Sequence, residues 1–577
     1  MKRSIHLSFA FFSTLFIILS TIAIAQPLSG NYTINSLMAT GGTNYASFND
    51  FASSLTANGI SSDVIATVEP GSGPYQESVI FQNITGLSSS SGITIQGSAE
   101  VITAATTTTD RHVVRLTDMS YFTINNLHVV RDTSSSGGFY GIHIFNTGNS
   151  IVISNCDIDI SGTISTLYGS IVASGSETSI LTTGDFHNLN IFGNTCSGGG
   201  YGVSVFGLVS NLASDINISS NFIYDFHSNG IYLRETDGAQ ISDNVFDKRT
   251  AQVTSTNAIQ IAQNANVNSN IFNNIINVSQ ASNGTMTIRG IYLFNGTGHK
   301  VYNNVMTDIR LTSGNFTAIE VRTGATAPKI YFNTISLDAS STTNGNLYGI
   351  KEELSNTNSE LRNNMISISQ PSTGLKGGLV LGSTSTVGSA FNSNYNNIFI
   401  PGGFVAIKGT TSPAFYATLT DWQNISTHDA NSSSSDPMFS SVAAPIPTNL
   451  ALDNTGLAIA GYVGDILGNI RSSTPDMGAY EFIANSIGGA PATSVLSVFP
   501  NPVFDFMNIK LDSKNSSAIE LNIFSQDGKL VRTINASELQ SLSSTSVDMH
   551  DLNDGMYFIR VISGEEIYQG KFIKLSK

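Results

Sequence analysis

Charged residues are scarce in this sequence. Asp, Glu, Lys and Arg make up 12% of the 577 residues, against roughly 25% in a typical soluble protein. Because helix formers such as Glu, Lys and Arg are few, β structure and turns are favoured over helices. The 26 Lys and Arg against 41 Asp and Glu give a net charge of −15. Such a chain has no general attraction for nucleic acid or anionic lipid, so we expect no nucleic-acid partner.

Long apolar runs are missing beyond the N-terminus. Lys2 and Arg3 precede an apolar run from about Phe9 to Ile24, and an Ala-x-Ala site ends at Ala25. This order predicts a secretory signal peptide at residues 1–25, with an uncleaved membrane anchor as the alternative. No later run approaches the roughly 20 apolar residues that a second span needs. We therefore expect an exported mature chain without a transmembrane segment.

What the sequence does contain is a short pattern that returns between about residues 140 and 400. Each copy has a glycine or alanine, an alternating apolar stretch, a loop, and an apolar residue three places before an asparagine. Seven intervals span 364 − 155 = 209 residues, a mean period of about 30, and units of that length must stack as a solenoid. The asparagines are Asn155, Asn194, Asn221, Asn244, Asn270, Asn304, Asn333 and Asn364.

The residue that starts each strand precedes its asparagine by a nearly constant interval. A strand-turn-strand of fixed length with variable loops favours a parallel β-helix, in which each coil adds about 4.8 Å. Stacked asparagine amides at a corner would bond the coils on either side and satisfy buried polar groups. The alternative is that these Asn-x-Ser/Thr-rich stretches are glycosylation acceptors. The intervals are 14, 14, 12, 14, 15 and 15 residues from Gly141, Gly230, Ala258, Gly290, Ala318 and Gly349.

At these residues the chain resembles the right-handed parallel β-helix proteins of the pectate-lyase-like superfamily, over roughly residues 30–484. The resemblance implies a scaffold more strongly than an activity. We predict an all-β fold: a right-handed parallel β-helix followed by a small antiparallel β-sandwich C-terminal domain. The predicted parts are an N-terminal cap and first coils at 26–110, repeats at 111–414, closing coils and a cap at 415–484, a linker at 485–495, and a last domain at 496–577.

The last domain opens with Pro500-Asn501-Pro502 and carries an Asp527-Gly528 turn between alternating strands, which favours an antiparallel sandwich. Leu552-x-x-Gly555-x-Tyr557 and a basic final strand follow. In this order the motifs resemble the type A C-terminal sorting domain of the bacterial type IX secretion system. The resemblance implies a Bacteroidetes source, the secretion translocon as partner, and release or attachment at the outer-membrane surface. The alternative is an immunoglobulin-like domain that binds sugar or a protein.

Strand alternation places aromatic and charged residues together on one outer face of the β-helix. Flat rings stack on sugar faces, and Arg, Lys and Glu bond sugar hydroxyls or uronate carboxylates. We therefore predict that this face contacts polysaccharide. The alternative is that these side chains belong to an ordinary exposed β-sheet, which aromatic cross-strand contacts stabilise. The predicted substrate-binding residues are Tyr232, Arg234, Tyr292, Phe294 and Glu353.

Catalytic signatures are mostly missing, since the chain has no Asp-Asp pair of the kind that polygalacturonases commonly carry. If the protein is a lyase, the resemblance and the neighbouring coils favour Glu320, Arg322 and Lys351 as the acid, base and charge-stabilising groups. Glu235 and Asp237 are candidate calcium ligands, although calcium takes six to eight oxygens. Calcium is thus a possible cofactor and no other is expected.

Two smaller features leave alternatives open. Arg471 with Asp465, Asp476 and Glu481 could form a catalytic group, or an end-cap in which carboxylates clamp the arginine. The two cysteines, at 156 and 196, exclude a disulfide scaffold and a four-cysteine zinc site. They follow consecutive repeats, so they form either a disulfide or two buried thiols.

The sequence therefore predicts a secreted, monomeric β-helix protein that acts on or binds extracellular polysaccharide. One hypothesis is a polysaccharide lyase or glycoside hydrolase. The other is a non-catalytic adhesin or glycan-binding protein.

Overall fold

The computed structural model describes residues 26–481 except 164, 251–253, 263–264, 283, 285, 354–357, 383–390 and 410–411, together with the strands and short adjoining pieces of 496–574. The predicted signal peptide and the predicted linker at 485–495 lie outside the described residues. Among those described, no helix is both long and apolar enough to cross a membrane. The chain forms two compact units, Met1–Phe482 and Ile483–Lys577.

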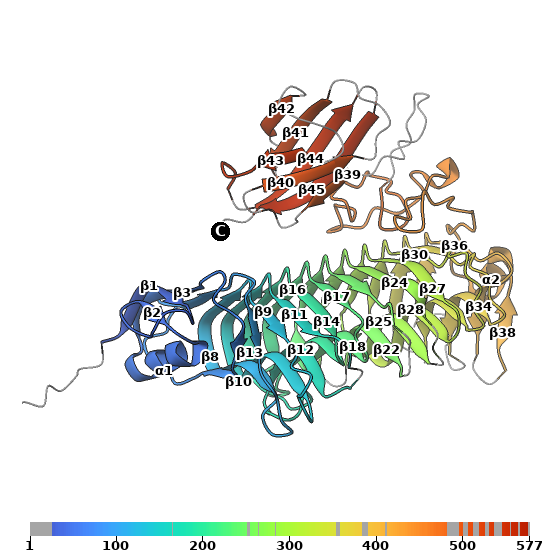
Figure 1. The fold of residues 1–577 in the computed structure, drawn as a ribbon. Helices are drawn as coiled ribbons and strands as arrows, with labels where there is room; N and C mark the ends of the chain where they lie inside the picture. Colours follow the sequence, from blue (N-terminus) through green and yellow to red (C-terminus); the bar gives the residue numbers. More distant parts are fainter. Residues whose placement is uncertain are drawn as a thin grey trace, which may run out of the picture. The chain divides into compact units, whose positions relative to one another are not determined.

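The first unit is a parallel β-helix of about 12 coils, which confirms the predicted fold class (Figure 1). Each coil contributes strands to three faces, and equivalent strands of successive coils pair in parallel. The first face holds β5 (Val79–Phe81), β8 (His112–Asn125), β10 (Phe139–Ser154), β12 (Tyr168–Ser174), β15 (Tyr201–Phe206), β18 (Asn229–Arg234), β22 (Thr256–Ile261), β25 (Thr287–Thr297), β28 (Asn315–Thr326), β31 (Leu347–Glu352), β34 (Lys376–Leu381) and β37 (Phe404–Lys408).

The second face continues from the first around a corner, because β8 and β10 run through the bend and pair on both faces. The third face is a separate 12-stranded sheet. The second face adds β1 (Leu28–Ile34), β2 (Asn44–Tyr45), β3 (Ile60–Val68), β6 (Ile93–Gln96), β13 (Asp185–Phe192), β16 (Ala213–Ser219), β19 (Thr236–Asp237), β20 (Gln240–Ser242), β23 (Asn270–Phe272), β26 (Lys300–Tyr302), β29 (Lys329–Tyr331), β32 (Ser359–Arg362) and β35 (Phe391–Asn394). The third holds β4 (Tyr75–Gln76), β7 (Val101–Thr103), β9 (His128–Val130), β11 (Asp157–Ile160), β14 (Thr195–Gly198), β17 (Phe222–Tyr224), β21 (Val245–Asp247), β24 (Ile275–Ser282), β27 (Val305–Leu311), β30 (Thr334–Ser336), β33 (Met365–Ser367) and β36 (Asn397–Phe399).

Where a repeat starts with glycine, close packing leaves no room for a side chain. A Cβ on Gly230 would lie 2.6 Å from the ring of Phe246, and one on Gly290 would lie 2.5 Å from the Ala318 carbonyl. Both distances are too short for non-bonded atoms. The strand-start residue and the apolar residue two places after the corner asparagine therefore share one layer of the core.

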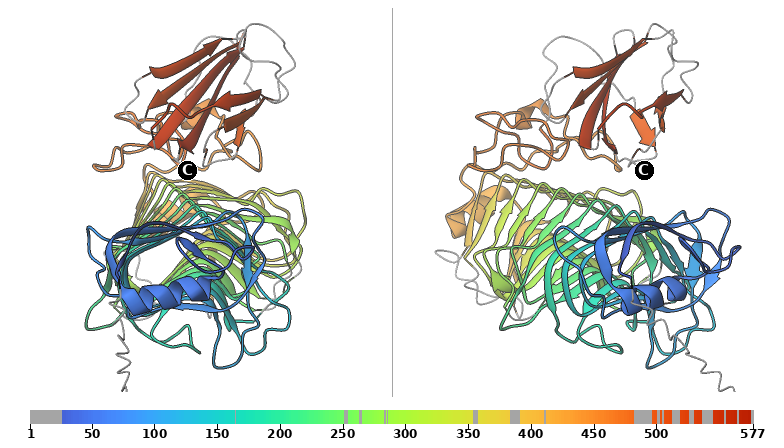
Figure 2. Two further views of the ribbon diagram at one scale, coloured as in Figure 1. Left: turned by 60° about the vertical axis from the view of Figure 1, so that its left-hand side comes forward. Right: turned by 90° about the vertical axis from the view of Figure 1, so that its left-hand side faces the viewer.

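Helices close both ends of the β-helix. At the N-terminal end, α1 (Phe48–Asn58) lies beside the first strands (Figure 2). It begins at Ser47, whose side chain accepts a hydrogen bond from Asp50 N, and its Phe48 and Phe51 are buried. At the other end, β38 (Ala414–Tyr416) pairs antiparallel with β37, and α2 (Leu419–Ser426) buries Trp422 completely. Covering the ends matters because open sheet edges pair with other chains.

After α2, in the part of the chain predicted as closing coils and a cap, the chain returns along the side of the β-helix and contacts Asn303 and Thr307. We call residues 430–481 the return segment. Among its described residues it holds one short 3-10 helix, η1 (Leu450–Leu452), and a single parallel bridge from Ser433 to Asn397. Its Tyr462 ring packs edge-on against Tyr302 and Tyr331, with ring centroids 4.9 and 5.1 Å away.

The second unit is a small antiparallel sandwich with its own core, as predicted. One sheet pairs β39 with β40 and β40 with β43, and the other has the order β42-β41-β44-β45. The strands are β39 (Leu496–Phe499), β40 (Phe506–Leu511), β41 (Ile519–Ser525), β42 (Leu530–Asn535), β43 (Thr545–Asp548), β44 (Gly555–Ser563) and β45 (Glu566–Lys574).

Candidate functional site

Buried asparagines form a continuous ladder at the corner between the second and third faces. Each amide Nδ2 donates to Oδ1 of the next asparagine at 2.9–3.0 Å and to a backbone carbonyl of the preceding coil. Each backbone N–H also bonds the next amide oxygen, so buried polar groups are paired in both directions. The ladder residues are Asn194, Asn221, Asn244, Asn274, Asn304, Asn333, Asn364 and Asn396.

The ladder prediction was wrong at two positions. Asn274 stands between Asn244 and Asn304, whereas Asn270 starts β23 and pairs with neighbouring strands of the second face. Asn155 occupies the preceding corner position with φ 53°, and its amide bonds Asn125 instead. Both residues carry an apolar residue three places earlier, so the motif alone could not separate them from true members.

Cys156 takes the place of an asparagine in the coil below Asn194. Its backbone N–H donates to Asn194 Oδ1 at 2.9 Å, while its sulfur lies 3.3 Å from the Ser154 carbonyl oxygen. Cys196 lies two residues after Asn194, on β14, and pairs in register with Ile158 on β11. Both cysteines are free and buried, and burial raises each thiol pKa to about 12, which excludes a role as a reactive thiolate.

The first face is covered over its N-terminal coils. Ile180, from the loop at residues 175–184, packs with Tyr140, Tyr201 and Phe206 outside the main core. The loop is fastened by Glu177, whose carboxylate lies 2.6 Å from Arg115. The outward-facing residues of the first face are therefore covered by this loop over these coils.

Tyr232 and Arg234 lie at the edge of the covered region. Tyr232 is half-buried, with its ring 5.1 Å from that of Phe206 and 5.7 Å from that of Tyr201. The Arg234 guanidinium lies over Phe206 at 5.9 Å, and its Nε is 3.1 Å from Glu235 Oε1. These contacts fix the side chains of both predicted sugar-binding residues against the protein.

The remaining predicted site residues come together on β25, β28 and β31, joined by Arg289, which the sequence reasoning missed. Tyr292, Glu320 and Lys351 are in register on successive coils. The Arg322 guanidinium lies 4.9 Å from the centre of the Phe294 ring and 2.7 Å from Glu353. The β25–β31 cluster is defined here as Arg289, Tyr292, Phe294, Glu320, Arg322, Lys351 and Glu353.

Glu320 is the buried centre of this cluster. Its side chain is fully buried, with Arg289 Nε at 2.7 Å and Lys351 Nζ at 3.5 Å from its two oxygens. Arg289 also lies over the Tyr292 ring at 4.6 Å. A signal for Arg289 exists in the sequence, because it lies on the same strand as Tyr292, but strict alternation does not place it beside Glu320.

The outer part of the cluster is more open and is electrostatically linked to Glu320. Arg322 is the most accessible member of the ion pairs, with 43% of its side chain exposed. Burial raises the pKa of Glu353, but the neighbouring Lys351 and Arg322 cations outweigh it, so this pKa lies below its ordinary value. The hydrogen bond with Tyr292 raises the pKa of Arg322, so Arg322 keeps its proton firmly.

The candidate calcium ligands do not gather into a metal site. Glu235 is fully buried, ion-paired with Arg234, and accepts a hydrogen bond from Ala265 N at 2.8 Å. Asp237 is exposed on β19. Within the described residues, no group of three or more His, Cys, Asp or Glu side chains is arranged to hold a metal ion.

The Arg471 group has the geometry of a clamp. Arg471 is buried, lies 3.2 Å from Glu481, and donates to the side-chain oxygen of Asn303 at 3.0 Å. Its guanidinium also stacks over Phe332 at 4.0 Å. These contacts fasten the return segment to the corner of the β-helix.

Two solved structures illustrate what the β-helix is similar to. GH136 lacto-N-biosidase from Eubacterium ramulus is 12% identical with a TM-score of 0.35, over 55% of this chain and 64% of that one. PfbA, a surface adhesin of Streptococcus pneumoniae, is 14% identical with a TM-score of 0.34, over 62% and 83%. The chain thus spans less than two thirds of the length of the lacto-N-biosidase. No curated protein matches the sequence.

The C-terminal unit does have a family match. Residues 497–575 match the model described as the secretion system C-terminal sorting domain. The matched residues contain nearly all of the two antiparallel sheets. The second unit is therefore a secretion sorting domain, and the chain is exported by type IX secretion to the cell surface or the extracellular space.

Proposed function

We propose that the protein is a secreted or surface-attached β-helix that binds an acidic polysaccharide at the β25–β31 cluster. The observation that carries the proposal is a local excess of positive charge in a strongly acidic chain. Arg289, Arg322 and Lys351 face Glu320 and Glu353, so 3 − 2 leaves one positive charge in the cluster.

An accessible arginine beside aromatic rings fits a uronate residue. A guanidinium binds a carboxylate through two parallel hydrogen bonds, which a lysine cannot reproduce. Arg322 is oriented by Glu353 and Tyr292, so little side-chain entropy remains to be lost on binding. Phe294 beside it offers a ring face to the apolar side of the sugar.

The same geometry favours binding over cleavage. Glycosidases use two carboxyl groups that flank the bond to be cleaved, whereas Glu320 is fully buried and Glu353 is ion-paired with Arg322 and Lys351. A lyase needs a group that releases its proton near neutral pH, and the pKa of Arg322 is raised. Burial likewise raises the pKa of Tyr292. Glu320, Arg322 and Lys351 are therefore proposed as binding and positioning groups.

The test is retention of the purified chain on immobilised polyuronates and on neutral glucans, with and without calcium. We expect retention on polyuronates that weakens with added salt, because the contact is ionic. Unsaturated uronates or new reducing ends in the eluate would show an enzyme instead. If no acidic polysaccharide retained the protein, the proposal would be wrong.

A further inference from the structure

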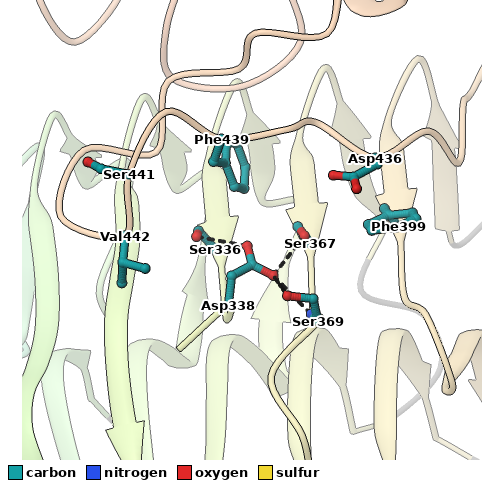
Figure 3. A pocket seen from close by; sticks show the side chains of 9 residues that line it. All are labelled: Ser336, Asp338, Ser367, Ser369, Phe399, Asp436, Phe439, Ser441 and Val442. Carbon is teal, nitrogen blue, oxygen red and sulfur yellow. Dashed lines mark hydrogen bonds between the residues drawn. The ribbon is translucent and has the colours of Figure 1, made fainter. Parts of the chain in front are cut away.

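A cavity of about 270 Å³ lies on the third face, away from the β25–β31 cluster (Figure 3). Its floor is formed by three adjacent coils of the β-helix. Ser336 and Ser367 end β30 and β33, Asp338 and Ser369 follow them, and Phe399 ends β36. The floor is thus built from residues of a repeating position, with serines on two coils and a phenylalanine on the third.

Asp338 organises the polar part of the floor. It accepts hydrogen bonds from Ser336 Oγ at 2.9 Å, Ser367 Oγ at 2.9 Å, and both Ser369 N and Oγ at 2.9 and 2.6 Å. Ser336 and Ser367 are buried and hold the carboxylate in place, whereas Ser369 is exposed and its oxygen, which donates to Asp338, keeps lone pairs for a ligand. The floor therefore presents acceptors whose orientation is fixed in advance.

The return segment forms the other wall. Phe439 stands opposite Ser336 and Asp338, and Asp436 lies beside Phe399 (Figure 3). Phe439 is half-buried against the apolar cluster containing Met365. Asp436 is exposed and uses Oδ1 to accept from Met438 N at 2.8 Å. Two aromatic rings and two carboxylates therefore face one small space.

The chemistry of this lining limits the ligand. Its polar groups are acceptors, and no Lys, Arg or His is among the residues that line it, so an anionic sugar would meet two carboxylates without a partner. Drug-sized ligands occupy pockets of roughly 300–1,000 Å³, so this volume suits a single ring. A hydroxylated ring with an apolar face supplies the donors that the acceptors need and stacks on the phenylalanines.

We propose that this cavity binds one neutral sugar ring, as a second carbohydrate site independent of the β25–β31 cluster. Phe399 and Phe439 contact the ring faces. Ser369 and Asp436, which are exposed, accept hydrogen bonds from the sugar hydroxyls. The return segment, by closing over the strands, is what completes the site.

The experiment is saturation-transfer NMR on the purified full chain with glucose, galactose, mannose and xylose, and with galacturonate as the acidic comparison. We expect transfer to at least one neutral sugar and none to galacturonate through this cavity. Phe439→Ala and Asp436→Asn should each weaken binding about tenfold or more. Asp436→Asn keeps the oxygen that accepts from Met438, so the local turn persists.

Phe222→Ala is the matched control, since Phe222 is an exposed phenylalanine on β17 of the same face. It should leave binding unchanged, as should Arg322→Ala, which disables only the β25–β31 cluster. Neutral-sugar binding that survives both cavity variants, or that is absent in the wild type, would overturn the inference. Neither result would affect retention on polyuronates, so the two proposals fail separately.

Discussion

Arg322 donates a hydrogen bond to the phenolic oxygen of Tyr292 on the preceding coil, at 3.0 Å. The bond fixes the most exposed cation of the β25–β31 cluster against a ring that is itself nearly buried. A guanidinium held in this way presents its remaining N–H groups in a constant direction. The coil stacking therefore prepares the geometry that carboxylate recognition requires.

Arg322→Ala should weaken retention on polyuronates by about tenfold or more, because one charge-assisted contact is lost. Arg322→Lys should restore only part of the affinity, since an ammonium cannot form the paired bonds. The comparison variant is Arg310→Ala, which removes an exposed arginine paired with Asp308 on β27. An equal loss in both alanine variants would mean that overall charge, and not this cluster, governs binding.

Asn274→Ala should destabilise the β-helix by about 3 kcal/mol, because several buried hydrogen bonds lose a partner. Asn270→Ala should change stability by less than about 0.5 kcal/mol, as is usual at a half-buried surface position. Urea unfolding of the two variants, followed by circular dichroism, measures the difference. The ladder assignment would be refuted if the Asn270 variant were less stable to urea than the Asn274 variant.

Asp429→Ala should destabilise the C-terminal end by about 3 kcal/mol. The buried carboxylate accepts from the Trp422 indole N–H at 2.8 Å, from Ser393 at 2.8 Å and from Ser432 at 2.7 Å. Asp421→Ala, at the exposed first turn of α2, should cost about 1 kcal/mol. Thermal unfolding with Trp422 fluorescence reports both, and similar losses would contradict a central role for Asp429.

His143 should make the β-helix sensitive to acid. Burial, with nearby His112 and Arg115, lowers the pKa of His143 from 6.5 to about 3. Between these values the unfolded chain binds a proton that the folded chain does not, so stability falls as pH decreases from 6.5 toward 3. His143→Gln should lose about 2 kcal/mol less than wild type on going from pH 6.5 to about pH 5. Parallel stability curves for the two proteins would rule this out.

The repeat, the strand faces and the sorting domain could be predicted from the sequence, because each depends on local periodicity or local motifs. The local motif could not distinguish Asn270 from Asn274, since both follow an apolar residue at the same spacing. Only the spacing to Asn244 and Asn304 separates them, being 30 residues on each side for Asn274.

The candidate sites were harder to predict because they depend on contacts between distant segments. Glu320 looked accessible by strand alternation, yet Arg289 and Lys351 from the two adjacent coils bury it. The cavity on the third face needs Phe439 to lie over Ser336, residues about a hundred positions apart. No periodic pattern contains that information.

The substitution of a thiol for an amide at Cys156 divides the molecule into two parts with different internal connections. From Asn194 onward, every coil is tied to the next by a fully buried asparagine amide, whereas the coils before it are joined at this corner by partly buried bonds such as that from Asn155 to Asn125. Amide hydrogens in the N-terminal coils should thus exchange with solvent sooner than those beyond residue 194. The β-helix should then begin to unfold from its N-terminal coils.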